Sequence, residues 1–115
     1  MLDIYEILVE DKLFKKIYDE KTTYYVFVND KARQSYKEEN ILTFKNKESE
    51  EKINVKILKF YYFASVKELV EMIGKQNLGY TPSITNDMIE DNYIHDYKLE
   101  DIEKYGLVVV KFEKI

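Results

Sequence analysis

The sequence predicts a single α+β domain over residues 1–115, a small mixed β-barrel with two to three helices packed at the barrel ends. Short segments rich in β-branched and aromatic residues alternate with segments that have the apolar period of a helix. The length suits one domain, and a chain that is 45% hydrophobic and 35% charged is not disordered. The order strand, helix, three strands, two helices, strand favours a barrel closed by helices.

The first half of the chain supplies three short strands and one helix. Residues 4–9 are apolar enough for a strand, and Asp11 is placed to cap a short helix after it. Residues 22–28 are all β-branched or aromatic, which predicts a strand that is at least partly buried on both faces. Residues 41–45 form the third predicted strand, and the polar segment 46–51 indicates a hairpin turn after it.

A longer strand with a change of buried face is predicted over residues 53–63. Its apolar residues are odd-numbered from Ile53 to Ile57 and even-numbered from Leu58 to Tyr62. Because side chains alternate along a strand, this change is typical of a β-bulge or of a bend at a barrel corner.

The clearest helix follows this strand. Ser65 and Glu68 fit a capping box, an apolar stripe continues at helical spacing, and Gly74 is placed to end the helix. The last strand is expected over residues 106–112.

A second helix is predicted between these elements, from Ser83 or Thr85 to Tyr93. Met88, Ile89 and Tyr93 are expected to point inward from it.

The charge of the chain is unevenly distributed. The net charge is −4, and most of the excess acid lies between residues 87 and 103. A chain of this kind does not bind duplex nucleic acid through general electrostatics, so any such binding must be local. The basic residues available for local binding are Lys12, Lys15, Lys16, Lys21, Lys31, Arg33 and Lys37.

The absence of cysteine excludes thiolate zinc sites, cysteine nucleophiles and disulfides. We expect no membrane partner and a cytoplasmic location, because no apolar run approaches the roughly 20 residues that span a bilayer. The first residues are also acidic where a signal peptide is basic. Asp87, Glu90 and Asp91 share one helix face near His95, the single histidine, and we expect a solvated acidic face there rather than a metal or cofactor site.

Lys21, Thr22 and Thr23 lie where the first helix leads into the strand at 22–28. A desolvated lysine at a barrel mouth would act as a base for a neighbouring threonine hydroxyl, which is one route to amide hydrolysis. The alternative is a solvated turn lysine followed by two threonines that favour a strand.

Three stretches of the chain carry a resemblance to a known family. They are residues 14–34, which include Lys21-Thr22-Thr23 and Asn29-Asp30; residues 40–44; and residues 78–88 together with 100–109. They resemble parts of the ASCH domain. The first stretch resembles its helix, Gly-x-Lys-Thr turn and Asn-Asp-x-x-Arg segment, and the second resembles its Gly-Asp-x-Ile-x-Phe strand. The third resembles its acidic helix and Glu-Lys-Tyr-Gly-Val-Val strand. This domain is a branch of the PUA-like barrel superfamily.

The resemblance implies a compact barrel with a cleft and a role in RNA binding, RNA processing or translation control. Some members deacetylate N4-acetylcytidine with a lysine, a threonine and a glutamate in that cleft. In an ungapped alignment, the family's cleft lysine falls on Thr22, its threonine on Tyr25 and its arginine on Phe27. Residues 72–86, where the third catalytic group is expected, contain no Asp or Glu. The polar cleft of the family is therefore replaced by an aromatic one.

These departures favour a non-catalytic module that binds RNA or a nucleotide in the barrel cleft, with aromatic rings for stacking and basic residues for phosphate. The residues expected to bind the ligand are Lys21, Thr22, Tyr25, Phe27, Lys31 and Arg33. One alternative is an amidohydrolase acting on a modified nucleoside such as N4-acetylcytidine, with Lys21 and Thr22 or Thr23 as catalytic residues. The other is a protein-interaction module that uses the acidic residues 87–103.

Overall fold

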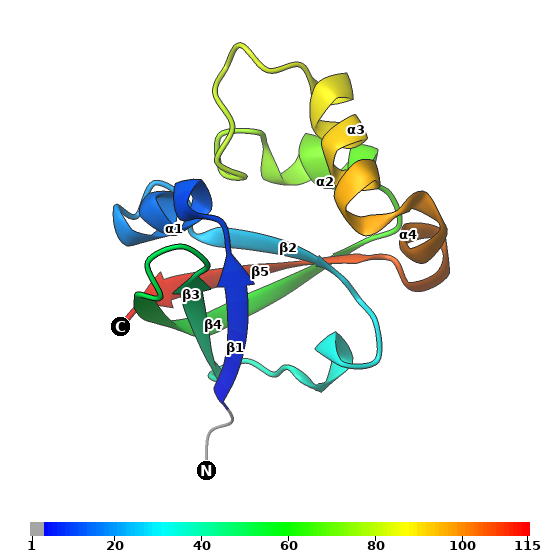
Figure 1. The fold of residues 1–115 in the computed structure, drawn as a ribbon. Helices are drawn as coiled ribbons and strands as arrows, with labels where there is room; N and C mark the ends of the chain where they lie inside the picture. The colour runs from blue at the N-terminus through cyan, green and yellow to red at the C-terminus, as the bar shows by residue number, and fades with distance from the viewer. Residues whose placement is uncertain (1–3) are drawn as a thin grey trace.

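The computed structural model describes residues 4–115 as a curled five-stranded sheet with four α-helices (Figure 1). The strands pair in the order β1, β3, β4, β5, β2, in which β1 is parallel to β3 and the other pairs are antiparallel. The sheet curls into a half-barrel with β1 and β2 as its edges, which confirms the predicted fold class. The strands are β1 (Ile4–Val9), β2 (Tyr24–Val28), β3 (Ile41–Asn46), β4 (Lys52–Phe63) and β5 (Leu107–Lys114).

Helix α1 (Asp11–Tyr18) connects β1 to β2, and α2 (Val66–Ile73), α3 (Asn86–Tyr97) and α4 (Leu99–Tyr105) lie between β4 and β5. Helices α2, α3 and α4 are grouped together over one face of the sheet, and α1 lies apart from them and packs against the other face (Figure 1). The longest helix, α3, has 12 residues, and no helix among residues 4–115 is long and apolar enough to cross a membrane. A short 3-10 helix at Arg33–Ser35 follows β2.

Two hydrophobic cores occupy opposite faces of the sheet. The inner core fills the curl, where Leu42 and Phe44 are fully buried together with α1 residues such as Ile17. The outer core lies between α2, α3 and α4 and the other face of the sheet, and it includes Leu69 and Ile89. Strand β5 contributes to both cores because successive side chains of a strand point to opposite faces.

The bulge predicted in β4 is confirmed, and Phe60 packs against the inner core as expected, but Tyr62, which was predicted on the same face, is 65% exposed. The β4–β5 pairing shifts register between Ile57 and Lys59, which marks a bulge. Before the bulge, odd-numbered residues such as Val55 lie in the inner core, and after it Tyr61 and Phe63 pack against the outer core. The bulge therefore reverses the alternation, so that odd-numbered residues face the inner core before it and the outer core after it.

Helix α2 begins as the sequence predicts, because the Ser65 side chain accepts a hydrogen bond from the Glu68 N–H at 3.3 Å. The prediction for α1 is wrong by one residue, since Glu10 is the N-cap and Asp11 is the first helical residue. Hydrogen bonds from Asn46 and from Lys15 hold the pKa of the Asp11 carboxyl below its usual value.

The second predicted helix is only partly correct. Ile89 and Tyr93 are buried in α3 as expected, but Met88 is 51% exposed and the helix continues to Tyr97. Helix α4 was not predicted. Lys98 joins α3 to α4 with a φ of 63°, a conformation that few side chains favour, so no pattern in the sequence marks this corner.

The strand predicted over residues 22–28 begins at Tyr24 instead. Thr22 is buried because its hydroxyl donates to the Asn77 carbonyl at 2.8 Å, in the loop after α2. This side-chain bond draws Thr22 out of the ladder with β5.

Gly106 ends α4 in a conformation that is essentially restricted to glycine, with φ 76° and ψ −178°. A β-carbon at this position would also lie 3.2 Å from the Phe63 carbonyl oxygen. We expect Gly106→Ala to lower the free energy of unfolding by about 1–3 kcal/mol, measured by urea denaturation.

The matched control is Gly74→Ala, because Gly74 has a φ of 87° but open space where the alanine methyl group would lie. Gly74→Ala introduces backbone strain without a close contact such as that with Phe63. It should therefore lower the free energy of unfolding by less than Gly106→Ala does. Equal stability of Gly106→Ala and the unmodified protein would contradict this account.

Candidate functional site

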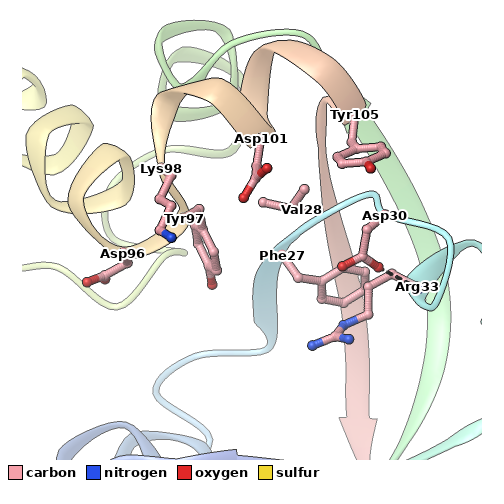
Figure 2. A pocket seen from close by; sticks show the side chains of 9 residues that line it. All are labelled: Phe27, Val28, Asp30, Arg33, Asp96, Tyr97, Lys98, Asp101 and Tyr105. Carbon is pink, nitrogen blue, oxygen red and sulfur yellow. Dashed lines mark hydrogen bonds between the residues drawn. The ribbon is translucent and has the colours of Figure 1, made fainter.

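Two adjoining pockets follow the outer edge of β2. The arginine pocket has a volume of about 360 Å³ and the tyrosine pocket about 390 Å³, and both are lined by Asp96 and Tyr97. The arginine pocket is lined by Phe27, Val28, Asp30, Arg33, Asp96, Tyr97, Lys98, Asp101 and Tyr105 (Figure 2). The tyrosine pocket is lined by Glu10, Lys12, Leu13, Lys16, Tyr24, Tyr25, Val26, Leu78, Tyr80, Tyr93, Asp96 and Tyr97.

The pockets lie beside β2 rather than over one of its faces. Consecutive residues of the strand line them, although consecutive side chains point to opposite faces. The Phe112 N–H donates to the Thr23 carbonyl, so the backbone groups of alternate residues 24, 26 and 28 point away from β5 toward the pockets. The groove thus runs along an edge of β2 that pairs with no other strand, although the Val26 carbonyl accepts from the Tyr97 hydroxyl and the Val28 carbonyl from the Asp30 N–H.

Tyr97 forms the wall between the two pockets. Its hydroxyl donates to the Val26 carbonyl at 2.6 Å, and its ring stacks with Tyr93 at a centroid distance of 6.1 Å. Burial raises the pKa of the Tyr97 hydroxyl, so it remains protonated and keeps this hydrogen bond. The wall is therefore held in place from both the sheet and the helix.

Arg33 lies at one end of the arginine pocket. The Asp30 carboxylate accepts a hydrogen bond from the Arg33 backbone N–H at 3.0 Å, and the guanidinium carbon lies 5.8 Å from the centre of the Phe27 ring. The Nε atom of Arg33 is buried and has no hydrogen-bond partner among residues 4–115. Because Nε is covered by protein atoms, any hydrogen bond from Arg33 to a ligand in the pocket would come from the terminal amino groups of its guanidinium, which is always charged.

Acidic side chains occupy the rest of the arginine pocket. Figure 2 shows the Asp101 carboxylate directed into the space beside Tyr97, with the Arg33 guanidinium at the opposite end, past the Phe27 ring. Asp30, Arg33 and Lys98 are the other charged residues of the lining, while the Asp96 side chain lies on the far side of Tyr97 and is directed away from the space (Figure 2). The pocket therefore offers both hydrogen-bond acceptors and donors.

The tyrosine pocket is lined by rings and by two lysines. Tyr80 and Tyr93 meet edge to face at a centroid distance of 6.1 Å, and burial raises the pKa of both hydroxyls. Burial also raises the pKa of Tyr25, and the nearby Arg33 charge opposes this effect. The Lys16 ammonium donates to the Gly79 carbonyl, whereas Lys12 is exposed at the rim.

The structure brings three of the predicted ligand-binding residues together. Tyr25 is half-buried in the tyrosine pocket, and Phe27 and Arg33 line the arginine pocket, although Phe27 is only 2% exposed and offers little of its ring. Lys21 and Lys31 are exposed and line neither pocket.

The residues of the amidohydrolase alternative do not meet at the groove. Thr22 is buried and its hydroxyl is engaged with Asn77, while Lys21 is exposed and forms no ion pair among the described residues. Glu68 and Glu71 of α2, which are candidates for the carboxylate that such a site would place near Lys21, are exposed as well. The amidohydrolase hypothesis gains no support from this geometry and stays a prediction.

Sequence reasoning did not assign the α3–α4 side of the arginine pocket to the ligand site. Five lining residues come from α3, α4 and their junction, namely Asp96, Tyr97, Lys98, Asp101 and Tyr105. The resemblance to the family covered part of this segment, but the sequence showed only an acidic stretch before a strand. Within residues 4–115, no three carboxylate or imidazole groups lie close enough together to hold a metal ion.

Comparisons with known proteins extend these observations at the level of the fold. No family model matches the sequence, and no curated protein is detectably similar to it. The crystal structure of hypothetical protein PH0355 has a TM-score of 0.84 at 24% identity, covering 98% of this chain and 100% of that one. The solution structure of PF0455 from Pyrococcus furiosus has a TM-score of 0.78 at 19% identity, covering 98% of each chain.

A third similar structure is the crystal structure of protein EF3133 from Enterococcus faecalis V583, assigned to the family DUF984. It has a TM-score of 0.71 at 15% identity and covers 100% of this chain and 77% of that one. All three identities are below 25%, so the comparisons show a shared fold. The chain thus belongs to a class of small α+β half-barrel domains with helices packed against the sheet.

Proposed function

We propose that the protein is a non-catalytic module of the ASCH type that binds single-stranded RNA or a nucleotide in the groove along β2. The observation that carries this proposal is Arg33, whose guanidinium lies over the Phe27 ring at the end of a pocket. Arginine planes and aromatic rings are the groups on which proteins stack and hydrogen-bond unpaired bases.

The aromatic wall of the groove supports binding of a base. Tyr97 borders both pockets and is held by the Val26 carbonyl, so a ring face is in place before a ligand arrives. Stacking of a base on such a ring contributes about 1–3 kcal/mol and is tolerant of sequence. The pocket volumes fall in the range of sites for small ligands.

The cations of the groove support contact with phosphate at its other end. Lys12 and Lys16 line the tyrosine pocket, one pocket away from Arg33. A nucleotide with its base in the arginine pocket would direct its phosphate toward these lysines. Because the net charge is −4, only such local contacts contribute, and the affinity should depend on salt through one or two phosphates.

The experiment is a fluorescence anisotropy titration with a short single-stranded RNA at several salt concentrations. We expect micromolar binding that weakens with salt, with a logarithmic slope of about −0.7 for each phosphate contact. Binding should perturb the backbone amide signals of residues around β2 and the α3–α4 corner in nuclear magnetic resonance spectra.

The exposed acidic residues Asp87 and Asp91 of α3 serve as the internal control, because they lie outside both pockets. Their amide signals should not move when RNA is added. Absence of binding at low salt would contradict the proposal. Perturbation confined to the acidic residues would place the contact with RNA outside the groove and contradict the proposed site.

A further inference from the structure

We infer that the arginine pocket is specific for guanine, with Asp101 and Arg33 as the two residues that read the base. This inference rests on the proposed function and adds the identity of the ligand. It depends on the chemistry of the two ends of the pocket and on the way in which the fold holds them.

The charges of the arginine pocket favour a neutral base over a phosphate group. The carboxylates of Asp30 and Asp101 offset the cations of Arg33 and Lys98 there, so a phosphate dianion would gain no net attraction. A nucleobase carries no net charge and presents both donors and acceptors on its edges. The pocket, which also offers both, is therefore complementary to a base.

Asp101 and Arg33 lie at opposite ends of the space, as Figure 2 shows. Asp101 is half-buried in the first turn of α4, and its own N–H donates to the Lys98 carbonyl at 3.1 Å. Neither side chain takes part in an ion pair among residues 4–115. The Asp101 carboxylate and the terminal amino groups of the Arg33 guanidinium are thus the charged groups that one ligand in this pocket would meet at its two ends.

Guanine is the base that fits this arrangement. Its N1–H and N2 amino group are adjacent donors, so one carboxylate accepts from both. Its O6 and N7 are adjacent acceptors, and arginine binds this pair with two parallel hydrogen bonds. Adenine, cytosine and uracil each lack a pair of adjacent donors on that edge, and they would leave part of the Asp101 carboxylate without a partner.

The corner between α3 and α4 fixes the spacing of the groups that read the base. Lys98 adopts a left-handed φ of 63°, and this residue directly follows Tyr97 and lies three positions before Asp101. Strained backbone of this kind persists where the surrounding structure determines it, and it is frequent at ligand sites. Tyr97 is in turn held by the Val26 carbonyl, so the stacking wall and the carboxylate are both positioned before binding.

The test compares the binding of GMP, AMP, CMP, UMP and IMP to the unmodified protein by isothermal titration calorimetry. We expect GMP to bind at least tenfold more tightly than AMP, CMP or UMP, because a good bidentate contact discriminates by about 1–3 kcal/mol. IMP lacks only the N2 amino group of GMP, so it should bind several-fold more weakly than GMP.

The variant Asp101→Asn should remove the difference between GMP and IMP, because a neutral amide no longer accepts from two donors on one edge. Glu100→Gln is the matched control, since Glu100 is exposed in the same turn of α4 and lines neither pocket. It should keep the preference of the unmodified protein for GMP.

Equal affinity for all five nucleotides would overturn the inference while leaving the proposed function intact. A preference for GMP over IMP that survives in Asp101→Asn would overturn the assignment of Asp101. Absence of binding to any nucleotide and to single-stranded RNA would instead contradict the proposed function itself.

Discussion

Replacement of Arg33 by glutamine is expected to weaken binding of GMP and of single-stranded RNA by roughly ten- to hundredfold. Loss of a hydrogen bond from a charged donor in a partly buried site costs about 1.5–3 kcal/mol, and each 1.4 kcal/mol is a factor of ten in affinity. The fold should tolerate this change, because Nε has no hydrogen-bond partner to lose among the described residues. Calorimetry with GMP and anisotropy with RNA measure the effect.

The matched control is Lys31→Gln, which removes an exposed cation two residues away that lines neither pocket. The affinity of this variant for GMP and for single-stranded RNA should stay within about twofold of that of the unmodified protein, as expected for a screened surface charge. Because Arg33 is proposed to bind a base, the salt dependence should keep its slope in Arg33→Gln. A slope lower by about one unit would place a phosphate at Arg33 and contradict the guanine inference.

Replacement of Phe44 by alanine is expected to produce the largest loss of stability. Phe44 is fully buried in the inner core, and its ring centre lies 5.2 Å from that of Tyr25 and 5.3 Å from that of Phe112. Truncation of such a side chain costs about 3–5 kcal/mol, through lost burial and the cavity that remains. Since domains of this size are stable by about 5–15 kcal/mol, the variant should unfold at a much lower urea concentration.

Tyr62→Ala is the control for this prediction. Tyr62 is 65% exposed on β4, so its truncation should change the free energy of unfolding by about 0.5 kcal/mol or less. A loss for Phe44→Ala no larger than that of Tyr62→Ala would contradict the description of the inner core.

The elements that were predicted correctly are those whose signal is local. Ser65 caps α2 because its hydroxyl and the Glu68 N–H are three residues apart, a relation that the sequence shows directly. The bulge in β4 was predicted from a change in the alternation of apolar residues, and the register shift after Ile57 confirms it. Both features are determined by neighbouring residues alone.

The elements that were missed depend on distant contacts. Met88 fits an apolar helix pattern but is exposed, because α3 presents Ile89 and Tyr93 to the outer core instead. Thr22 fits a strand but lies outside it, because its hydroxyl binds the Asn77 carbonyl 55 residues away. No local pattern contains information about such partners.

The candidate site also has one side that the sequence indicated and another that depends on distant contacts. Tyr25, Phe27 and Arg33 were singled out from a resemblance that aligns the strand side of the groove, and the structure places them at its pockets. The opposite side comes from α3 and α4, whose corner depends on the unusual backbone of Lys98. From the sequence alone, Asp101 was therefore recognised only as one of several acidic residues.

The sequence by itself determined the fold class, the succession of strands along the chain and the aromatic character of the segment that becomes β2. These features follow from the spacing of apolar residues, from helix capping and from composition, which are properties of short segments. The tertiary structure decided which edge of the sheet remains unpaired and which charged residues face one another across it. These features arise when segments about 70 residues apart meet, as Tyr97 and Val26 do through one hydrogen bond. The sheet pairing and the helix packing that bring such segments together are set by the burial of the two cores as a whole.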